Sequence, residues 1–299
     1  MSRKMQVLKL IYYLDRVSNL GDLLSPYIIG RLSGLPVQYK YILGIKGMIL
    51  ASFRFLCHRI SREKFDEVLF PWESNILGIG SILAWGNRKS IVWGSGFMNR
   101  REKFHGGKIY AVRGKLTNEK LIADGFRGCS VFGDPALLLP ILIPIPLQID
   151  KLYDIAIIPH WSEFDYFSKK YGSEYRLLDI RTGRVEAFIM SLVSCRCVLS
   201  SSLHGIILAH AYNIPALWIK YGDIGTDGFK FHDYFSSVDI PLYDGISNFE
   251  PYLKAGNWKE LFTNHQDCVL PHIDIRLLQK KLLEVAPFKL LSQYESMIR

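Results

Sequence analysis

Short apolar runs alternate with longer segments of mixed polarity along the whole chain. In the first half, apolar runs that end near Gly or a polar residue predict buried strands, with helical patterns between them. The predicted strands cover Val7–Leu14, Asn75–Gly80, Ser90–Trp93, Lys108–Val112 and the short run Cys129–Phe132. The predicted helices cover Leu23–Leu32 and Thr117–Asp124, the second with Thr117 as its N-cap and Gly125 as its stop.

The same alternation restarts after the proline-rich stretch Pro135–Ile149. Strand-like runs cover Asp154–Ile158, Arg176–Ile180, Cys197–Ser200 and Ala216–Ile219, and helix-like segments cover Arg184–Ser194 and Leu203–Tyr212. Alternating strands and helices favour an α/β fold with parallel sheets and helices on both faces. With a proline-rich linker near residues 140–150, the pattern predicts two Rossmann-like domains facing a cleft.

We therefore expect an N-terminal domain over residues 1–145 and a C-terminal domain over residues 146–299. The amphipathic pattern of Ile273–Ile298 predicts one or two final helices, the last of which can pack back on the first domain. Parallel sheets bind ligands beyond the carboxyl ends of their strands. Functional residues are therefore expected at the strand-to-helix junctions.

Residues Val37–Ile60 give an ambiguous pattern, because aromatic and basic side chains are mixed in it. Two interpretations stay open: a surface helix that associates with a membrane, or a helix packed in the core.

Composition is that of an ordinary globular protein, with 49% hydrophobic and 22% charged residues in a chain of 299. This excludes disorder, collagen and coiled coil as descriptions of the whole chain. Lys and Arg number 37 against 28 Asp and Glu, and the net charge of +9 favours anionic partners. The basic residues do not gather in one strip interleaved with aromatics, so nucleic acid is not an expected partner.

The N-terminus is basic and then apolar, as in a signal peptide, but Asp15 and Arg16 end the apolar run without a cleavage site. The five Cys have no regular spacing, which argues against a disulfide framework and a zinc site. We therefore expect a cytoplasmic protein with reduced thiols and no metal site.

One junction carries the most informative chemistry, where a buried strand meets a Ser-rich turn and an apolar helix at Ser200–Gly205. The hydroxyl of Ser201 or Ser202 is expected to cap this helix, whose N-terminus suits a phosphate or carboxylate. His204 lies in the first helical turn, where the helix dipole favours a neutral imidazole. A purely structural histidine in a capped helix is the alternative.

A second cluster of basic residues follows in the loop after the next strand. Lys220 ends that strand, Lys230 opens the next helix, and His232 lies just beyond it. Cations at the carboxyl end of a strand suit an anionic ligand. A solvated loop is the alternative.

In the first half, Arg113 follows a strand and can form a forked pair with a carboxylate or phosphate. Asn19 and Asp22 lie in the turn before the first helix, where they bind a sugar hydroxyl or only cap the helix. The sequence contains no D-x-D pair and no H-E-x-x-H or G-x-S-x-G motif.

Five short motifs follow one another in an order that resembles the polysaccharide pyruvyl transferase family, and most of all the bacterial exopolysaccharide ketal pyruvyl transferases of the succinoglycan type. They are Asn19-x-Gly21-Asp22, Leu77-Gly-Ile-Gly80, Ala111-Val-Arg113-Gly, Gly133-Asp134-Pro135-Ala136-Leu137-Leu138, and Ser202-Leu203-His204-Gly205 through Asn213-Ile-Pro215. Each motif is short, and their order and spacing carry the resemblance over nearly the whole chain.

The resemblance implies a GT-B-like fold, phosphoenolpyruvate as donor and a pair of sugar hydroxyls as acceptor, with no cofactor. It also implies that His204 is catalytic and that Arg113 contacts the donor. Relatives commonly have Arg-Leu-His where this chain has Ser202-Leu203-His204, so Arg113, Lys220 or Lys230 would supply the missing charge. Ser201, Ser202 and His232 complete the expected donor site, and Asn19 and Asp22 form the expected acceptor site.

Two other functions remain open from the sequence. One is a GT-B glycosyltransferase that uses a nucleotide sugar, and the other is a non-catalytic relative that binds glycan or phosphate. The expected acceptor is a sugar of a bacterial exopolysaccharide or other surface glycan, either free or carried on a lipid. An anionic membrane surface is therefore an expected partner, with the protein peripheral at the inner face of the cell membrane.

Overall fold

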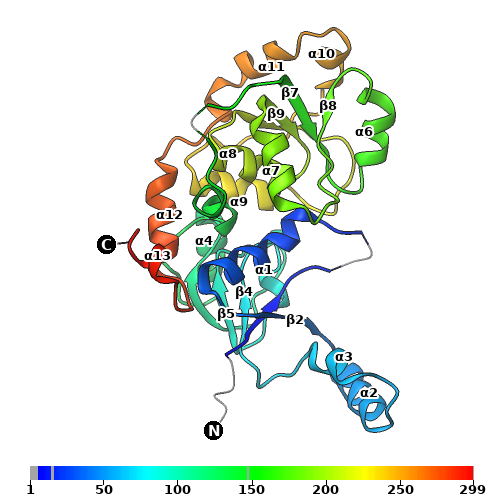
Figure 1. Cartoon of the computed structure of the whole chain (residues 1–299), viewed down its shortest axis with the longest axis vertical. Coiled ribbons are helices and arrows are strands. Elements are labelled where there is room, and N and C mark those ends of the chain that lie inside the picture. The colour runs from blue at the N-terminus through cyan, green and yellow to red at the C-terminus, as the bar shows by residue number, and fades with distance from the viewer. Residues whose placement is uncertain (1–5, 15–16, 147, 299) are drawn as a thin grey trace.

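Two parallel β-sheets flanked by helices form the body of the protein (Figure 1). The structure is a computed structural model that describes residues 6–14, 17–146 and 148–298. Asp15 and Arg16, which end the first apolar run of the sequence, lie outside these residues. The predicted α/β class with parallel sheets is confirmed.

The first sheet has six parallel strands in the order β3-β2-β1-β4-β5-β6. In chain order they are β1 (Leu8–Ile11), β2 (Val37–Ile42), β3 (Val68–Leu69), β4 (Asn75–Leu77), β5 (Ser90–Trp93) and β6 (Lys108–Ala111). The predicted strands of the first half are present but shorter, except β5, whose limits match the prediction. Cys129–Phe132 contributes only an isolated bridge from Phe132 to Val112. The sequence pattern missed β2 and β3.

The second sheet has four parallel strands in the order β10-β9-β7-β8. They are β7 (Tyr153–Ile158), β8 (Arg176–Leu177), β9 (Cys195–Ser200) and β10 (Ala216–Trp218). Each overlaps a predicted strand, although β8 is much shorter than the predicted run Arg176–Ile180. β7 and β9 pair along their full lengths, so Ile158 lies beside Ser200 at the carboxyl ends of both strands.

Helices connect the strands and cover the sheets. The helices around the first sheet are α1 (Leu20–Ser33), α2 (Ile45–Leu56), α3 (Arg62–Asp66), η1 (Leu83–Trp85), α4 (Lys115–Ala123), η2 (Pro135–Leu138) and α5 (Leu139–Leu142). Those of the second half are α6 (Phe164–Tyr171), α7 (Val185–Val193), α8 (Leu203–Ala211), α9 (Phe229–Ser237), α10 (Glu250–Lys254), α11 (Trp258–Asn264), η3 (Gln266–Cys268), α12 (Ile275–Glu284) and α13 (Ser292–Glu295). The predicted N-cap of α4 is wrong: Gly114 occupies that position, and Thr117 lies inside the helix.

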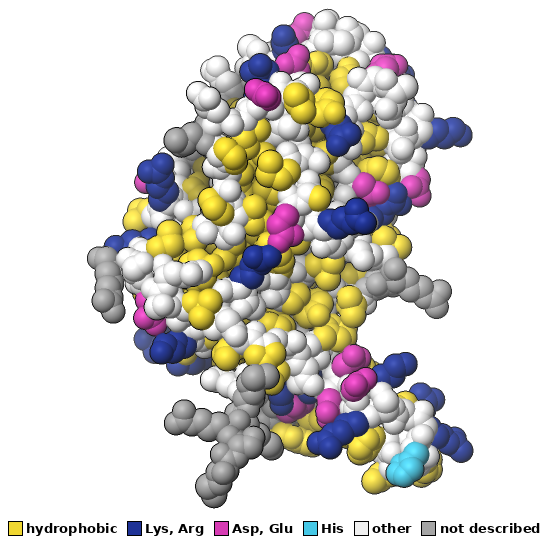
Figure 2. Space-filling model, in the orientation of Figure 1, with side chains coloured by type: hydrophobic (Ala, Val, Ile, Leu, Met, Phe, Trp, Pro, Cys, Tyr) yellow, Lys and Arg dark blue, Asp and Glu magenta, His cyan; other side chains and the backbone are white. Residues whose placement is uncertain are grey.

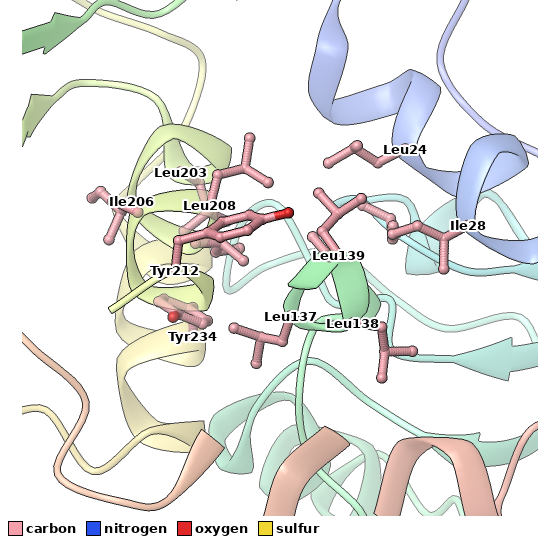
Figure 3. Close-up of a cluster of buried hydrophobic side chains, with 14 of the residues drawn as sticks. Leu24, Ile28, Leu137, Leu138, Leu139, Leu203, Ile206, Leu208, Tyr212 and Tyr234 are labelled. Atoms are coloured by element: carbon pink, nitrogen blue, oxygen red, sulfur yellow. The ribbon is translucent and has the colours of Figure 1, made fainter. Parts of the chain in front are cut away.

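The proline-rich segment begins in the core and not as a linker. Residues 135–139 are buried, and η2 packs between α1 and α8 (Figure 3). Leu137 and Leu138 of η2 belong to the same buried cluster as Leu24 of α1 and Leu203 of α8. The apolar side chains that precede the linker expected near residues 140–150 therefore join the two halves in one core.

The C-terminal helices pack against the first sheet. Trp93 of β5 donates a hydrogen bond from its indole N–H to the carbonyl of Leu282 in α12, at 3.0 Å. Gln279 of α12 donates to the carbonyl of Leu137, at 2.7 Å. The chain thus returns to the first half after completing the second sheet.

Residues 43–66 leave the body after β2 and form a projection that we call the arm, made of α2 and α3 (Figure 1). The ambiguous segment Val37–Ile60 is thus a strand followed by a surface helix, and Ala51 is the only buried residue of α2. A helix packed in the core, the second interpretation of this segment, is wrong. Within the described residues, no helix is long and apolar enough to cross a membrane.

Candidate active site

A cavity of about 220 Å³ lies where the N-terminal ends of α1, α8 and α9 approach one another. Asn19 and Asp22 line it from α1, Ser202 and His204 from α8, and Lys230 from α9. The remaining wall is made by Tyr13, Gly80, Ser81, Ile82, Trp85, Met98, His160, Trp161, Leu203 and Ile224. Helix N-termini carry partial positive charge and free N–H groups, so this arrangement suits an anion.

The wall from α1 is formed by a capped helix start. Asn19 is the N-cap residue, and its side-chain oxygen accepts a hydrogen bond from the N–H of Gly21 at 3.3 Å. Its amide nitrogen donates to the Asp22 carboxylate at 2.7 Å. Burial raises the pKa of Asp22 to about 7, although the Asn19 hydrogen bond and the Lys230 charge act in the opposite direction. Asp22 can therefore exchange a proton near neutral pH.

The wall from α8 begins directly after β9. Ser202 is the N-cap residue of α8, but its hydroxyl makes no capping hydrogen bond, and the Ser201 hydroxyl donates instead to Glu163 at 2.5 Å. The predicted hydroxyl cap is therefore wrong. The N–H groups of Leu203, His204 and Gly205 have no acceptor among the described residues. These donors remain available to a ligand.

His204 is held in place by two close neighbours. A Cβ atom on Gly21 would lie 2.0 Å from His204 Nδ1, so only glycine permits this position of the ring. On the other side, Nε2 lies 3.9 Å from an Asp134 carboxylate oxygen, and neither buried atom has a hydrogen-bond partner in the described part of the chain. Because Nε2 is buried, Nδ1 is the ring nitrogen that a ligand in the cavity can reach.

Burial and two nearby cations keep His204 neutral. Burial, followed by the charges of Lys230 and Arg113, lowers the pKa of His204 to about 3. Burial also raises the pKa of Asp134 to about 6, against the hydrogen bond from the Ala136 N–H and the Arg113 charge. At neutral pH, a neutral imidazole therefore faces a mostly ionised carboxylate, and that negative charge would stabilise an imidazolium formed on His204.

Lys230 is a buried cation that lies 5.3 Å from the centroid of the Phe231 ring but has no anionic partner among the described residues. Only 5% of the residue is exposed, and its ammonium group has no hydrogen bond or ion pair with any residue that the structure describes. Burial, followed by the Arg113 charge, lowers the pKa of Lys230 to about 8, while Asp22 and Glu163 act in the opposite direction. A buried unpaired charge destabilises a fold, so this position indicates a site for an anion.

Residues after β7 complete the cavity and were missed by the sequence analysis. His160 lines the cavity, and burial, followed by the Lys230 charge, lowers its pKa to about 3. Its backbone N–H donates to the Ser201 hydroxyl at 2.8 Å. Glu163 accepts from the N–H of Gly222 at 2.8 Å as well as from Ser201. The sequence could have indicated His160, because this residue follows a predicted parallel strand by two residues and ligands bind at the carboxyl ends of such strands.

Arg113 lies behind the cavity and does not line it. Its guanidinium is fully buried and donates to Asp233 at 2.9 Å, to the Ser81 hydroxyl at 2.6 Å and to the Phe97 carbonyl at 2.6 Å. Asp233 also accepts from the N–H and the hydroxyl of Thr117, both at 2.7 Å. The forked pair expected of Arg113 is not formed: only its Nε atom donates to a carboxylate, that of Asp233 on α9, and the other two nitrogens donate to Ser81 and Phe97.

The other predicted donor residues lie apart from this cavity. Ser201 and Lys220 line a second cavity of about 520 Å³, which shares Ile224 with the first. His232 lies outside both linings, and its Nε2 atom is 3.0 Å from the Tyr243 carbonyl. The structure thus brings Asn19, Asp22, Ser202, His204 and Lys230 together, and it separates Arg113, Ser201, Lys220 and His232 from them.

These features define an α/β protein with a cavity lined by the N-termini of helices from both halves and by Lys230, an arrangement that suits a small anion. The family model described as polysaccharide pyruvyl transferase matches residues 19–223, a range that contains most of the cavity lining. The chain belongs to the polysaccharide pyruvyl transferase family.

A viral relative shares part of this sequence. Uncharacterized protein L143 of Acanthamoeba polyphaga mimivirus is 30% identical over 170 residues, which cover 54% of this chain and 59% of that protein. The match thus spans little more than half the length of either chain. No solved structure matches this chain significantly.

Proposed function

We propose that this protein transfers a pyruvyl group from phosphoenolpyruvate to two hydroxyls of a sugar in a surface glycan, forming a ketal and releasing phosphate. One observation carries the proposal: three helix N-termini meet at a cavity that holds the unpaired cation Lys230 and the neutral His204. Membership of the family supports the same reaction.

The donor is a small molecule with a carboxylate and a phosphate, and both groups need positive partners. The ammonium of Lys230 and the free N–H groups at the start of α8 are the proposed partners. In this scheme they replace the arginine that relatives carry at the position of Ser202. Arg113 is assigned a positioning role, because its donors are already used by Asp233, Ser81 and Phe97.

The reaction moves two protons and breaks one bond to phosphate. A proton adds to C3 of the donor, a sugar hydroxyl oxygen bonds to C2, and the hydroxyl gives up its proton. The bond from C2 to the phosphate oxygen then breaks, the second hydroxyl oxygen bonds to C2, and its proton leaves with the phosphate. No oxidation state changes overall, so the reaction calls for no redox cofactor.

Two cavity residues suit these proton transfers. His204, neutral at pH 7, is the proposed acceptor of the hydroxyl proton, with Asp134 stabilising the imidazolium that forms. Asp22, with a pKa of about 7, is the proposed proton donor near the acceptor sugar, and Asn19 orients it. The second cavity, which adjoins the first at Ile224, offers room for the rest of the acceptor.

We also propose that the two sheets are the cores of two Rossmann-like domains in a GT-B-like arrangement, over residues 1–145 and 146–299. In this arrangement α1 belongs to the acceptor side and α8 to the donor side. The strand orders of the two parallel sheets support this assignment.

A phosphate-release assay tests the proposed function. The full chain is incubated with phosphoenolpyruvate and a panel of lipid-linked repeat-unit glycans, and with nucleotide sugars in parallel. We expect phosphate release that depends on both phosphoenolpyruvate and a glycan, and a pyruvyl ketal in the product by mass spectrometry. Glycosyl transfer from a nucleotide sugar would instead support a glycosyltransferase, and donor binding without release on any acceptor would support a non-catalytic relative.

The matched variants are His204→Ala and His210→Ala, which lie on the same helix. His204→Ala should lower turnover about a hundredfold or more, the usual size of an acid–base contribution. His210 contacts the Tyr234 hydroxyl at 3.0 Å and lies outside the cavity, so its variant should keep its turnover once folded. A folded His204→Ala protein with normal turnover would remove His204 from the mechanism.

A further inference from the structure

The arm presents an apolar face that nothing in the described chain covers. Ile45, Ile49, Phe53 and Leu56 follow one another at helical spacing on α2, and they are 74%, 65%, 56% and 75% exposed. Helices of soluble proteins normally turn such a stripe toward the core. Here the buried side is the opposite one, marked by Ala51. The exposed stripe therefore indicates a surface that meets something apolar.

The apolar surface extends beyond the helix into a preformed groove. A cavity of about 550 Å³ runs between the stripe and the segment Phe70–Trp72, where Trp72 is 70% exposed. Stacked rings hold this groove together: Phe55 of α2 lies 4.4 Å from Phe65 of α3, and Phe70 lies 4.9 Å from Trp72, between ring centroids. Phe65 also lies 5.5 Å from Phe70, so ring contacts run from α2 through α3 to the segment Phe70–Trp72.

Basic residues surround the apolar stripe. The arm contains five Lys or Arg residues, which are Lys46, Arg54, Arg59, Arg62 and Lys64, and two acidic residues, Glu63 and Asp66. Arg62 lies 3.7 Å from the Asp66 carboxylate, so Lys46, Arg54 and Arg59 are the cations that precede this ion pair. Figure 2 shows hydrophobic and basic side chains toward the tip of the arm, with acidic side chains where the arm joins the body. An apolar stripe bordered by cations is the pattern of a helix that lies in the interface of an anionic membrane.

We propose that the arm docks the protein on an anionic lipid surface, with the stripe of α2 and Trp72 in the interface and with Lys46, Arg54 and Arg59 at the headgroups. A second copy of this chain fits the surface less well, because two arms packed face to face would bring like charges together. Lipid headgroups supply the opposite charge, and each nearby Lys or Arg adds to the attraction.

A further groove lies between the base of the arm, which begins after Ile42, and the candidate active site. Tyr39, Tyr41 and Ile42 of β2 line a cavity of about 490 Å³ together with Trp85, and Trp85 also lines the active-site cavity. If the proposed function holds, a lipid-linked acceptor anchored beside the arm can lie along this aromatic groove and reach His204. Docking itself rests on the arm alone and not on the reaction.

Co-sedimentation of the full chain with vesicles tests the proposal. One set of vesicles is phosphatidylcholine, and the other is an equal mixture of phosphatidylcholine and phosphatidylglycerol. We expect binding to the anionic vesicles at low salt, with much weaker binding to the neutral ones and a marked loss at high salt, because salt screens exposed charges.

Two double variants separate the contributions of the arm. Ile49→Ser with Phe53→Ser removes the stripe, and Lys46→Glu with Arg54→Glu reverses two charges. Each should lower the partition coefficient roughly tenfold or more. The matched controls lie outside the arm on exposed positions: Leu242→Ser with Leu277→Ser, and Lys280→Glu with Lys281→Glu. They should bind as the wild type does.

The outcomes distinguish docking from catalysis and from self-association. His204→Ala should bind vesicles normally, so loss of the reaction leaves this test intact. Absence of binding to anionic vesicles at low salt overturns the proposal, and so do arm variants that bind like the wild type. The proposal is also overturned if the protein binds no vesicles and is a dimer in analytical ultracentrifugation that the stripe variant converts to a monomer. That result would mean that a second copy of the chain covers the stripe.

Discussion

Two buried cations lie close together in this protein, and their surroundings are opposite. Arg113 donates to Asp233, Ser81 and Phe97, whereas Lys230, three residues before Asp233 on the same helix, has no polar partner among the residues described. Arg113 also contributes to the lowered pKa values of Lys230 and His204. The hydrogen bonds of Arg113 join the first half of the chain to α9. The ammonium group of Lys230 makes no such bond and faces the cavity.

The difference separates structural charge from functional charge. A buried ion pair whose members also make hydrogen bonds holds two segments in a fixed position, and removal of one member leaves an uncompensated charge. A buried cation without a partner costs stability at all times and is retained where a ligand supplies the missing charge. Sequence alone cannot distinguish these two cases, because both residues occur at strand-to-helix junctions.

The largest expected effect comes from removing the completed pair. Arg113→Ala leaves Asp233 buried without its cation and should lower the free energy of unfolding by about 3–5 kcal/mol. Urea denaturation followed by circular dichroism measures it, with the exposed Arg127→Ala as control. A normal midpoint combined with lost donor affinity would contradict this account and return Arg113 to the donor site.

The next effect tests the contact that positions His204. Gly21→Ala places a methyl group against Nδ1 of His204, and a displacement of about 1 Å at a reacting group lowers turnover about a hundredfold. Gly30→Ala on the same helix is the control, because its nearest neighbour would be Val37 at 3.6 Å. Turnover measured on both proteins should fall only in the first. Equal turnover would show that the ring position does not matter.

A smaller effect follows from the lowered pKa of Lys230. Its ammonium loses its proton above about pH 8, and Asp22 gains a negative charge above about pH 7, so affinity for an anionic donor should fall as pH rises. Titration calorimetry with phosphoenolpyruvate from pH 6 to pH 10 measures it. Constant affinity over this range would show that the donor does not contact the ammonium.

Stability should change with pH in the opposite direction. Between about pH 8 and the ordinary lysine pKa of 10.5, the unfolded chain binds more protons at this position than the folded one. The contribution of Lys230 to the free energy of unfolding therefore rises across this window. The stability difference between Lys230→Met and the wild type should narrow accordingly, as urea titrations at several pH values can show.

The smallest effect is expected at Lys220. This residue is exposed and lines only the second cavity, so solvent screens its charge from a donor in the first cavity. Lys220→Ala should leave phosphoenolpyruvate affinity within about threefold of the wild type. A loss as large as that of a Lys230 variant would shift the donor toward the second cavity.

Much of the fold and part of the site could be predicted from local pattern. The strands of the second sheet and the start of α8 follow from apolar periodicity. His204 and Lys230 could be placed at the cavity because ligands bind beyond the carboxyl ends of parallel strands, where both residues occur. Both inferences depend only on residues close together in the sequence.

The rest depends on partners far away in the chain or on which face of an element meets the body. Asp233 lies 120 residues from Arg113, so nothing local reveals that this arginine is already satisfied. Asp134 approaches His204 only because η2 enters the core beside α8. The helical period of α2 shows an apolar stripe but not that the stripe faces outward.

The central claim is that Lys230 is left unpaired in order to bind the anionic donor. Titration calorimetry with phosphoenolpyruvate at pH 7 tests it on the wild type, on Lys230→Met and on the exposed Lys280→Met as control. We predict that the wild type and the control bind and that Lys230→Met does not, although it unfolds with about 1–3 kcal/mol more stability because a buried charge is gone. Binding by Lys230→Met with wild-type affinity, or no binding by the wild type, would contradict the claim.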